Sequence, residues 1–347
     1  MSHPAWMLYG TNGYTGRLIA QEAVSRGMRP VLAGRSSRSI EGLAHESGCP
    51  YRVFALDDAD EVTRHLDGVS LVLNCAGPFS KTAPQFISAC LRAKVHYLDI
   101  TGEIDVIEGA AAQDARAREA GVAVVPAVGF DVVPSDCLAL MLAERLPNAT
   151  HLILAFTAGG EVSPGTAKTM LEIMPGGGRA RIDGQICRVP ADWKARTVPF
   201  PSGPREAVTI PWGDVASAYY STGIANIETY LAASPAILRR SRWLRRFARV
   251  PFLRGLAQRW IERSITGPTP QQRAAAHAEL WGQVSDADGR VAAAALVTAD
   301  GYTLTVLAAL AAVELVLAGR APSGFSTPAR AFGKEFVLSL PGTRLVE

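Results

Sequence analysis

The chain has 347 residues, of which 48% are hydrophobic and 19% are charged, and its formal net charge is +3 at pH 7. This composition excludes an intrinsically disordered chain, because it can bury enough apolar surface to offset the entropy of ordering. The small net charge is far from that of a dedicated nucleic-acid binder, and the length allows two modest domains.

A glycine-rich turn joins the first predicted strand to the first predicted helix. The apolar run Ala5–Tyr9 predicts a strand, and Arg17–Arg26 has the apolar spacing of a helix. Glycine permits a tight turn and a close approach of the backbone to a pyrophosphate, while the helix N-terminus supplies N–H groups and a positive dipole end. The predicted cofactor-binding residues of this turn are Gly10, Thr11, Asn12, Gly13, Tyr14, Thr15 and Gly16.

The second predicted strand, Pro30–Ala33, ends where a dinucleotide site selects its ribose. An NAD site has an acidic residue there, about 20 residues after the glycines. This chain instead has Arg35, followed by Ser36 and Arg38. An arginine can pair with a 2′-phosphate, which a carboxylate would repel. We therefore predict NADP(H) rather than NAD(H), with a solvated arginine at a strand end as the alternative.

The alternation of strands and helices then continues. The predicted strands are Tyr51–Leu56, Val69–Cys75, Val95–Ile100 and Val122–Val125, and the predicted helices are Ala59–Leu66, Ala83–Ala93 and Ile107–Ala120. In a doubly wound parallel sheet the carboxyl ends of the strands line the ligand crevice. Further cofactor contacts are therefore expected from Asp57, Cys75, Ala76, Gly77, Pro78, Phe79 and Gly102.

The second half has a different pattern. Ser135–Leu146 predicts a helix with Ser135 as a plausible N-cap, and His151–Thr157 predicts a strand. Hairpins are expected at Asp183–Gly184 and Asp288–Gly289, which gives a mixed sheet with helices on one face. The apolar run from Tyr302 to Ala318 is too short and too rich in alanine for a bilayer span, so it predicts a buried helix.

Several segments together resemble one family. They are GTNGYTGR, AGRSSR, NCAGPFS, HYLDITGE, GFDVVPSD, SPGTAKTM, PWGDVASAYYSTGIANIE and TPARAFG. In this order they are similar to the saccharopine dehydrogenase-like oxidoreductases, and within that group to the bacterial trans-acting enoyl reductases.

The resemblance implies an α/β fold in three parts. These are a Rossmann NADP-binding domain (1–130), an inserted mixed-sheet substrate domain (131–304), and a C-terminal helix and tail (305–347) that packs back on the first domain. The Tyr-x-x-x-Lys pair of short-chain reductases is absent, because none of the eight tyrosines has a lysine four residues later.

Four residues are candidates for proton transfer or for polarising a substrate. Asp131, Ser135 and Asp136 follow a strand end that should face the nicotinamide, and Glu103 follows the neighbouring one. A structural role is the alternative for each, such as helix-dipole stabilisation by Asp136. The same alternative applies to Asp99 as a turn stabiliser, to Lys168 in an apolar helix, and to Tyr219 and Tyr220 as strand aromatics.

No metal site is predicted from the histidines and cysteines. The six histidines show no paired ligand spacing, and His96 is expected to be structural because it begins its strand at the end far from the crevice. The five scattered cysteines indicate neither a disulfide framework nor a zinc site and favour a reducing cytoplasm. The N-terminus has no signal-peptide pattern.

A basic stretch, Ala236–Arg263, carries nine arginines and one glutamate, a net charge of +8 that leaves −5 on the rest of the chain. Apolar and aromatic residues recur between the arginines at helical spacing. Such a stretch is typical of contact with an anionic membrane surface or an acidic carrier protein. A solvated face or a homodimer interface is the alternative, and nucleic acid is not expected because no binding fold accompanies the charge.

The predicted function is NADP(H)-dependent reduction of an unsaturated (enoyl) acyl or lipid-like small molecule by hydride transfer. Two alternatives stay open. One is a saccharopine-type reductase of amino-acid imines, for which Lys168 with Arg179 or Arg181 would hold the carboxylates. The other is a non-catalytic NADP(H)-sensing protein. The predicted location is the cytoplasm, with peripheral membrane association through the basic stretch.

Overall fold

The computed structural model describes residues 5–157, 162–167, 177–190, 193–232 and 264–346. Lys168, most of the predicted helix Thr166–Met174 and the basic stretch Ala236–Arg263 lie outside the described residues. The described chain divides into two compact units. Unit 1 contains Met1–Val133 and Leu304–Phe336, and unit 2 contains Pro134–Thr303 and Val337–Glu347.

Unit 1 is built on a seven-stranded parallel sheet with the order β15-β6-β5-β4-β1-β2-β3. Its strands are β1 (Trp6–Tyr9), β2 (Val31–Gly34), β3 (Tyr51–Val53), β4 (Leu71–Asn74), β5 (His96–Asp99), β6 (Ala123–Val125) and β15 (Gly324–Phe325). The order reverses at β1, which confirms the predicted doubly wound Rossmann sheet. Because β15 pairs with β6, the C-terminal region does return to this sheet.

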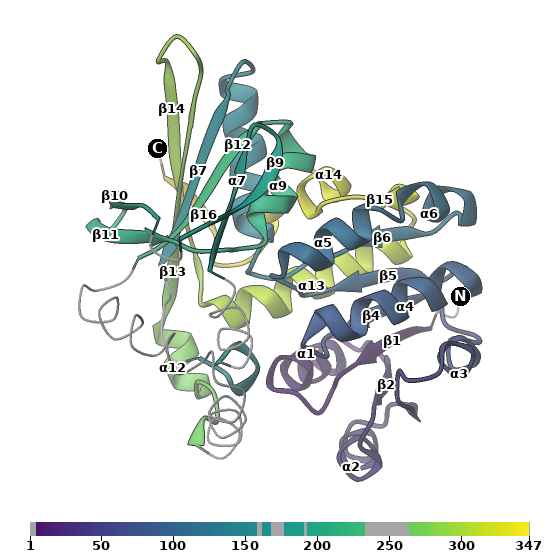
Figure 1. Ribbon diagram of the computed structural model, residues 1–347. Coiled ribbons are helices and arrows are strands. Elements are labelled where there is room, and N and C mark those ends of the chain that lie inside the picture. Colours follow the sequence, from purple (N-terminus) through teal and green to yellow (C-terminus); the bar gives the residue numbers. More distant parts are fainter. Residues whose placement is uncertain (1–4, 158–161, 168–176, 191–192, 233–263, 347) are drawn as a thin grey trace. The chain divides into compact units, whose positions relative to one another are not determined.

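Helices cover both faces of the sheet. They are α1 (Tyr14–Ser25), α2 (Ser37–Ser47), α3 (Ala59–Arg64), α4 (Phe79–Ala93), α5 (Ile104–Ala111), α6 (Asp114–Ala120), α13 (Gly301–Leu317) and α14 (Pro328–Phe332). Successive strand residues point to opposite faces, so Met7 and Tyr9 join the apolar cluster under α3–α6 while Leu8 points the other way. Figure 1 shows α4 and α5 along one face of the strands and α13 along the other.

One local prediction in this unit is wrong. The predicted helix Ile107–Ala120 is two helices, α5 and α6, separated at Ala112 and Gln113. The second starts at Asp114, whose carboxylate accepts the backbone N–H of Phe325 in β15 and pairs with Arg118. This long-range contact fixes the start of α6, and no short-range pattern can reveal it.

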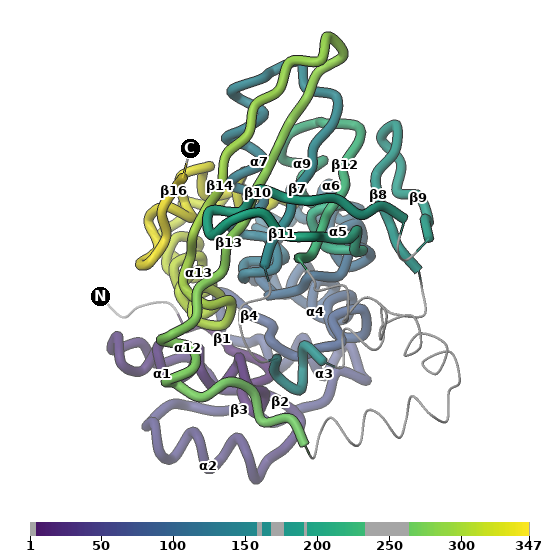
Figure 2. The backbone as a smooth tube through the Cα atoms, turned by 90° about the vertical axis from the view of Figure 1, so that its left-hand side faces the viewer, coloured from purple at the N-terminus to yellow at the C-terminus, as the bar shows by residue number. Residues whose placement is uncertain are grey.

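Unit 2 contains a nine-stranded mixed sheet, as predicted. Its strands are β7 (His151–Thr157), β8 (Gly178–Ile182), β9 (Gln185–Val189), β10 (Ala195–Phe200), β11 (Gly203–Thr209), β12 (Asn226–Ala232), β13 (His277–Ser285), β14 (Val291–Ala299) and β16 (Arg344–Val346). Among the paired strands that the structure describes in this sheet, only β7 and β12 run parallel. Both predicted hairpins are present as β8–β9 and β13–β14, and Figure 2 shows β13 and β14 as a long hairpin beside β7.

The helices described in unit 2 include α7 (Val133–Arg145), α9 (Asp214–Thr222) and α12 (Pro270–Ala275). The helix α7 packs so closely on β13 that a Cβ on Gly282 would lie 2.7 Å from Leu142 Cδ1. Ser135 is not the N-cap of α7, because that helix already begins at Val133. Tyr219 and Tyr220 lie on α9 and are therefore not strand aromatics.

The predicted boundary at 305 needs one correction. The end of the chain, Val337–Glu347, belongs to unit 2 rather than to the first unit. Here β16 pairs antiparallel with β14 and thereby extends the mixed sheet. The rest of the returning segment, Leu304–Phe336, belongs to unit 1. Among the described residues, no helix is both long enough and apolar enough to cross a bilayer.

Candidate functional site

The turn between β1 and α1 is a backbone cradle that only glycine can form. Gly10 has a φ of +87°, and a Cβ there would lie 2.8 Å from the backbone N of Ala76. A Cβ on Gly16 would lie 2.3 Å from the carbonyl oxygen of Gly10. The turn therefore touches both the start of its own helix and the turn that follows β4, and it leaves open backbone where a pyrophosphate binds.

The N-terminus of α1 is suited to an anion. Its N-cap residue is Gly13, no side chain caps it, and its first turn has no acidic residue. The first N–H groups of a helix have no partner within the helix, and they add to the positive end of the helix dipole. Thr11 does not contribute its side chain to this surface, because it is fully buried and its hydroxyl points to the carbonyl oxygen of Ala33 at 3.4 Å.

Basic and hydroxyl side chains follow β2 at the same edge of the sheet. Arg35 and Arg38 are exposed, and Ser36 is the N-cap of α2, a second helix whose first turn lacks an acidic residue. Arg35 and Asp57 both lie close enough to Tyr9 to affect its pKa, which burial raises to about 12 while Arg35 opposes the rise. The structure thus brings the predicted ribose-selecting residues together at the carboxyl ends of β1, β2 and β3.

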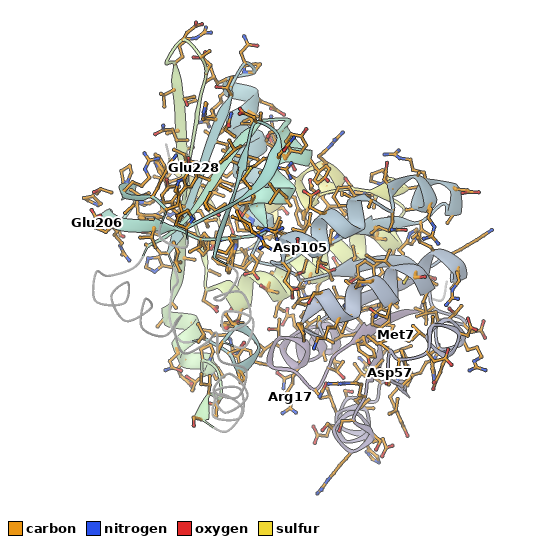
Figure 3. The ribbon with its side chains drawn as sticks, viewed as in Figure 1. Met7, Arg17, Asp57, Asp105, Glu206 and Glu228 are labelled. Carbon is orange, nitrogen blue, oxygen red and sulfur yellow. The ribbon has the colours of Figure 1, made fainter. Side chains whose placement is uncertain are left out.

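Parallel pairing places the starts of the following helices at one end of the sheet. Figure 3 labels Arg17 near the start of α1 and Asp105 near the start of α5, and both lie at this end. The turn after β4, which contains Cys75, Ala76, Gly77 and Pro78, lies at the same end. The carboxyl ends of all these strands thus form one continuous edge, where a dinucleotide binds in this fold.

Glu103 has a structural contact that the sequence did not indicate. Its two carboxylate oxygens accept the backbone N–H groups of Phe79 at 2.7 Å and Ser80 at 2.9 Å, at the start of α4. The 15-residue helix α4 is therefore capped by a carboxylate 24 residues away in sequence. This contact assigns Glu103 to the positioning of α4, and it makes this N-terminus unsuitable for a phosphate.

Asp131 lies in the turn after β6, against the turn after β5. A Cβ on Gly102 would lie 2.7 Å from Asp131 Oδ2 and 3.2 Å from its Cγ, so Gly102 makes room for this carboxyl group. Burial raises the pKa of Asp131 from 3.8 to about 7. A carboxyl group with this pKa is half protonated at neutral pH, which suits proton transfer.

The turn that holds Asp131 is anchored to α13. The backbone N–H of Phe130 donates to Thr305 Oγ1 at 3.0 Å, and a Cβ on Gly129 would lie 3.1 Å from Thr305 Cγ2. Sequence analysis missed Thr305, which is 175 positions from Phe130 in the chain. The combination of a glycine with a threonine in an apolar helix is too common to have revealed it.

Ser135 and Asp136 lie within α7, and both are buried. Asp136 accepts a hydrogen bond of 2.5 Å from the hydroxyl of Ser221 on α9, so its carboxylate joins two helices of unit 2. The structural alternative therefore accounts for Asp136. His96 is also structural as predicted, because its Nδ1 accepts the N–H of Ala123 at 3.0 Å.

A family model matches part of unit 1. Residues 6–125 match the model of the saccharopine dehydrogenase NADP binding domain. This part of the chain is therefore similar to that NADP-binding domain. NADP(H) is therefore the cofactor class of the domain, and the glycine cradle and the uncapped N-terminus of α1 fit it.

Curated relatives match a little less than half of the chain. A probable mitochondrial saccharopine dehydrogenase-like oxidoreductase of Arabidopsis thaliana is 30% identical over 179 residues, which are 45% of this chain and 39% of that protein. A trans-acting enoyl reductase of Mycobacterium bovis is 28% identical over 183 residues, which are 48% of this chain and 44% of that protein. The aligned part thus spans less than half the length of these relatives.

A solved structure resembles the whole chain. Saccharopine dehydrogenase (L-Glu forming) from Saccharomyces cerevisiae superimposes with a TM-score of 0.67 over 99% of this chain and 100% of that one, at 11% sequence identity. At this identity the likeness concerns the fold alone, and it includes the mixed sheet of unit 2. The chain is thus similar both to an NADP-binding domain model and to a saccharopine dehydrogenase-like oxidoreductase.

The described part of the chain holds no group of three or more His, Cys, Asp or Glu residues able to bind a metal ion. The buried thiols also fit no reactive role, because burial raises the pKa values of Cys75, Cys90 and Cys137 well above the usual range. All five cysteines are free. The titratable candidates at the carboxyl edge of the sheet are therefore the aspartates.

Proposed function

We propose that this chain is an NADPH-dependent reductase of an enoyl acyl or lipid-like substrate, with Asp131 as its proton donor. When bound, NADPH supplies a hydride, which reduces one carbon of the polarised double bond. The other carbon then needs a proton to complete the reduction. The observation that carries the proposal is the Asp131 carboxyl group, half-buried beside Gly102 at the carboxyl edge, with a pKa raised to about 7.

Each part of the edge has one task in this proposal. The cradle of Gly10, Gly13 and Gly16 admits the pyrophosphate to the N-terminus of α1. Arg35 attracts the 2′-phosphate, and the first turn of α2 contains no acidic residue that would repel it. This arrangement favours NADPH over NADH. Asp131 holds the proton that the substrate carbon accepts.

The contacts of Arg181 favour the enoyl substrate over an amino-acid imine. Its side chain is only 4% exposed; Nε donates to Val215 O at 2.9 Å and Nη1 to Gly184 O at 2.7 Å. The guanidinium also lies 4.1 Å from the centre of the Tyr219 ring. A substrate carboxylate would have to displace these contacts, so Arg181 is a poor carboxylate receptor. The trans-acting enoyl reductases among the relatives give the same preference.

The proposal includes a cytoplasmic location and a role in lipid metabolism. The five free cysteines are consistent with a reducing compartment. An acyl substrate accords with the basic stretch Ala236–Arg263, which we propose as a contact for an anionic membrane surface or an acidic carrier protein. A homodimer interface is the other use proposed for this stretch.

The test follows the oxidation of NADPH by its absorbance with trans-2-enoyl thioesters of increasing chain length. An amino acid with a 2-oxo acid, which form an imine, is tested in parallel. We expect oxidation only with the thioesters, and a loss of about 100-fold in kcat for Asp131→Asn with unchanged NADPH affinity. The matched control is Asp105→Asn, an exposed aspartate in the first turn of α5.

The results separate the alternatives. Oxidation with the imine mixture alone would replace the enoyl substrate by an amino-acid imine. NADPH binding without oxidation by either substrate class would favour the sensing protein. If Asp131→Asn kept the kcat of the wild type, Asp131 would not be the proton donor.

A further inference from the structure

Three polar side chains form a buried network beneath the carboxyl edge of the Rossmann sheet. Asn74 ends β4, and Tyr97 and Asp99 belong to β5; all three are completely buried. Buried polar groups usually cost folding free energy unless they are paired, so a complete network in a sheet core calls for a reason beyond stability. Neither the cofactor cradle nor the proton donor includes these residues.

Asp99 joins the turns that follow β5 and β6. Its Oδ1 accepts the N–H of Thr101 at 3.0 Å and the N–H of Ala127 at 2.8 Å. Its backbone carbonyl accepts the N–H of Val128 at 2.7 Å. Ala127 has a φ of +62°, in the left-handed region that a side chain disfavours. The hydrogen bonds that Asp99 accepts from Ala127 and Val128 thus hold the strained residue Ala127, which lies four positions before Asp131.

Tyr97 and Asn74 extend the network to the turn after β4. The Tyr97 hydroxyl donates to Asp99 Oδ2 at 2.8 Å and accepts from Asn74 Nδ2 at 3.3 Å. Asn74 Oδ1 accepts the N–H of Ala76 at 3.0 Å, and Nδ2 also donates to Thr82 Oγ1. The Thr82 hydroxyl in turn donates to the carbonyl of Ala76 at 2.7 Å. Ala76 is therefore held at both its N–H and its C=O.

The network thus ties together the turns after β4, β5 and β6. In a doubly wound sheet these turns form the second half of the dinucleotide crevice, whereas the turns after β1, β2 and β3 hold the adenosine half. We propose that the network of Asn74, Tyr97 and Asp99 positions the nicotinamide half of NADPH, with Asp99 in its ionised form as the central positioning residue. This inference rests on the proposed function, since it requires NADPH as the ligand.

The ionised form matters because a carboxylate only accepts hydrogen bonds. Asp99 accepts both turn N–H groups on Oδ1 and the Tyr97 hydroxyl on Oδ2. A proton on Oδ2 would reverse the bond to Tyr97 and remove the negative charge that strengthens the two bonds to the turns. The titratable groups that act on it are Tyr97, Glu103 and Cys75, of which Glu103 disfavours its ionisation. Burial raises the pKa of Asp99 to about 6, so the network loses its ionised centre in mildly acidic solution.

The experiment compares two ligands on the full chain. NADPH probes both halves of the crevice, and adenosine 2′,5′-bisphosphate probes the adenosine half alone. At pH 8 we expect Asp99→Asn to weaken NADPH binding about tenfold and to change bisphosphate binding by less than twofold. Tyr97→Phe, which removes one hydroxyl and keeps the ring, should weaken NADPH binding about threefold. The control His96→Ala removes a contact at the opposite end of β5 and should leave both affinities unchanged.

The pH dependence gives a second readout that a purely structural role would not produce. The 2′-phosphate of NADPH also titrates near pH 6, so the useful quantity is the ratio of the NADPH dissociation constants of Asp99→Asn and wild type. We expect this ratio to fall from about ten at pH 8 to about two at pH 5, as Asp99 of the wild type gains its proton.

Equal weakening of both ligands, or a ratio that stays constant with pH, would overturn the positioning role. Should Asp99→Asn fail to fold, unchanged NADPH binding by Tyr97→Phe would overturn it equally. A wild-type protein that binds neither ligand would overturn the proposed function as well. Failure of the proposed function is thus distinguished from failure of the positioning role alone, in which the wild type still binds NADPH.

Discussion

Substitution of Gly16 by alanine tests whether the glycine cradle is a cofactor site. A Cβ at this position would lie 2.3 Å from the carbonyl oxygen of Gly10 and 2.9 Å from its carbon, whereas ordinary contacts begin at 3.4 Å. The two segments must therefore separate by about 1 Å. The Gly10 carbonyl also accepts the N–H of Gly13 at 3.0 Å, so this separation opens the turn.

The magnitude follows from two opposing effects on stability and one on binding. Overpacking costs about 1–3 kcal/mol, while replacing a helical glycine by alanine returns up to about 1 kcal/mol. We expect a net loss of about 1–2 kcal/mol in the free energy of unfolding. Hydrogen bonds to a charged group contribute about 1.5–3 kcal/mol each, so misplacing the N–H groups of the turn should weaken NADPH binding about 100-fold.

The assays are a fluorescence titration with NADPH and unfolding in urea. Gly42→Ala is the matched control, because Gly42 lies in α2 and a Cβ there would meet no atom within 4 Å. This control should bind NADPH normally and gain about 0.5–1 kcal/mol of stability. The reasoning is refuted if Gly16→Ala binds NADPH within threefold of the wild type, or if Gly42→Ala loses as much affinity.

Four further outcomes are expected. Arg35→Asp should lower the preference for NADPH over NADH by about 10–100-fold in parallel titrations. The control is Arg29→Asp, which replaces an exposed arginine before β2 and should leave this preference unchanged. Glu103→Gln should lower the free energy of unfolding in urea by about 1 kcal/mol, because the N-terminus of α4 loses a charged acceptor; no loss would contradict this cap. Binding to anionic vesicles through Ala236–Arg263 should weaken with salt, and no binding at low ionic strength would leave a solvated or dimer face. Burial raises the pKa of Asp131 from 3.8 to about 7, so between about pH 4 and 7 the native state keeps this proton while the unfolded chain loses it. The stability of the wild type relative to Asp131→Asn should therefore fall as the pH rises through that window. A difference in stability that stays constant with pH would contradict the raised pKa.

The strands were predictable because each is a short apolar run followed by glycine or polar residues. All six predicted strands of the Rossmann domain exist, with ends shifted by at most a few residues. The first residues of the helices were harder to predict from the sequence. The helix α1 begins at Tyr14, three residues before the predicted start, because its N-cap is Gly13, which has no side chain to reveal it. The helix α4 begins at Phe79 rather than Ala83, and its cap is the distant Glu103.

The same limit applies to the site. Local spacing placed Gly10, Arg35 and Gly102 at one edge, since parallel pairing fixes where strands end. It could not show that Gly102 is a glycine because Asp131 needs its space. It also could not separate Glu103 from Asp131, because both are acidic residues just after strand ends. Only their partners, which come from other strands and helices, distinguish the helix cap from the proposed proton donor.

The aspartate that ends β5 and the aspartate that follows β6 bear on the reduction that we propose. Asp99 and Asp131 both have pKa values raised by burial, which costs stability at neutral pH. Hydrogen bonds from Ala127, Thr101 and Tyr97 oppose this rise at Asp99, so its pKa is about 6 and it is mostly ionised at pH 7. The pKa of Asp131 is about 7, so this carboxyl group is protonated in about half of the protein molecules at pH 7. Environments that act differently on two carboxyl groups suit them to different roles, and we propose that Asp99 accepts the hydrogen bonds that hold the turns while Asp131 donates the proton.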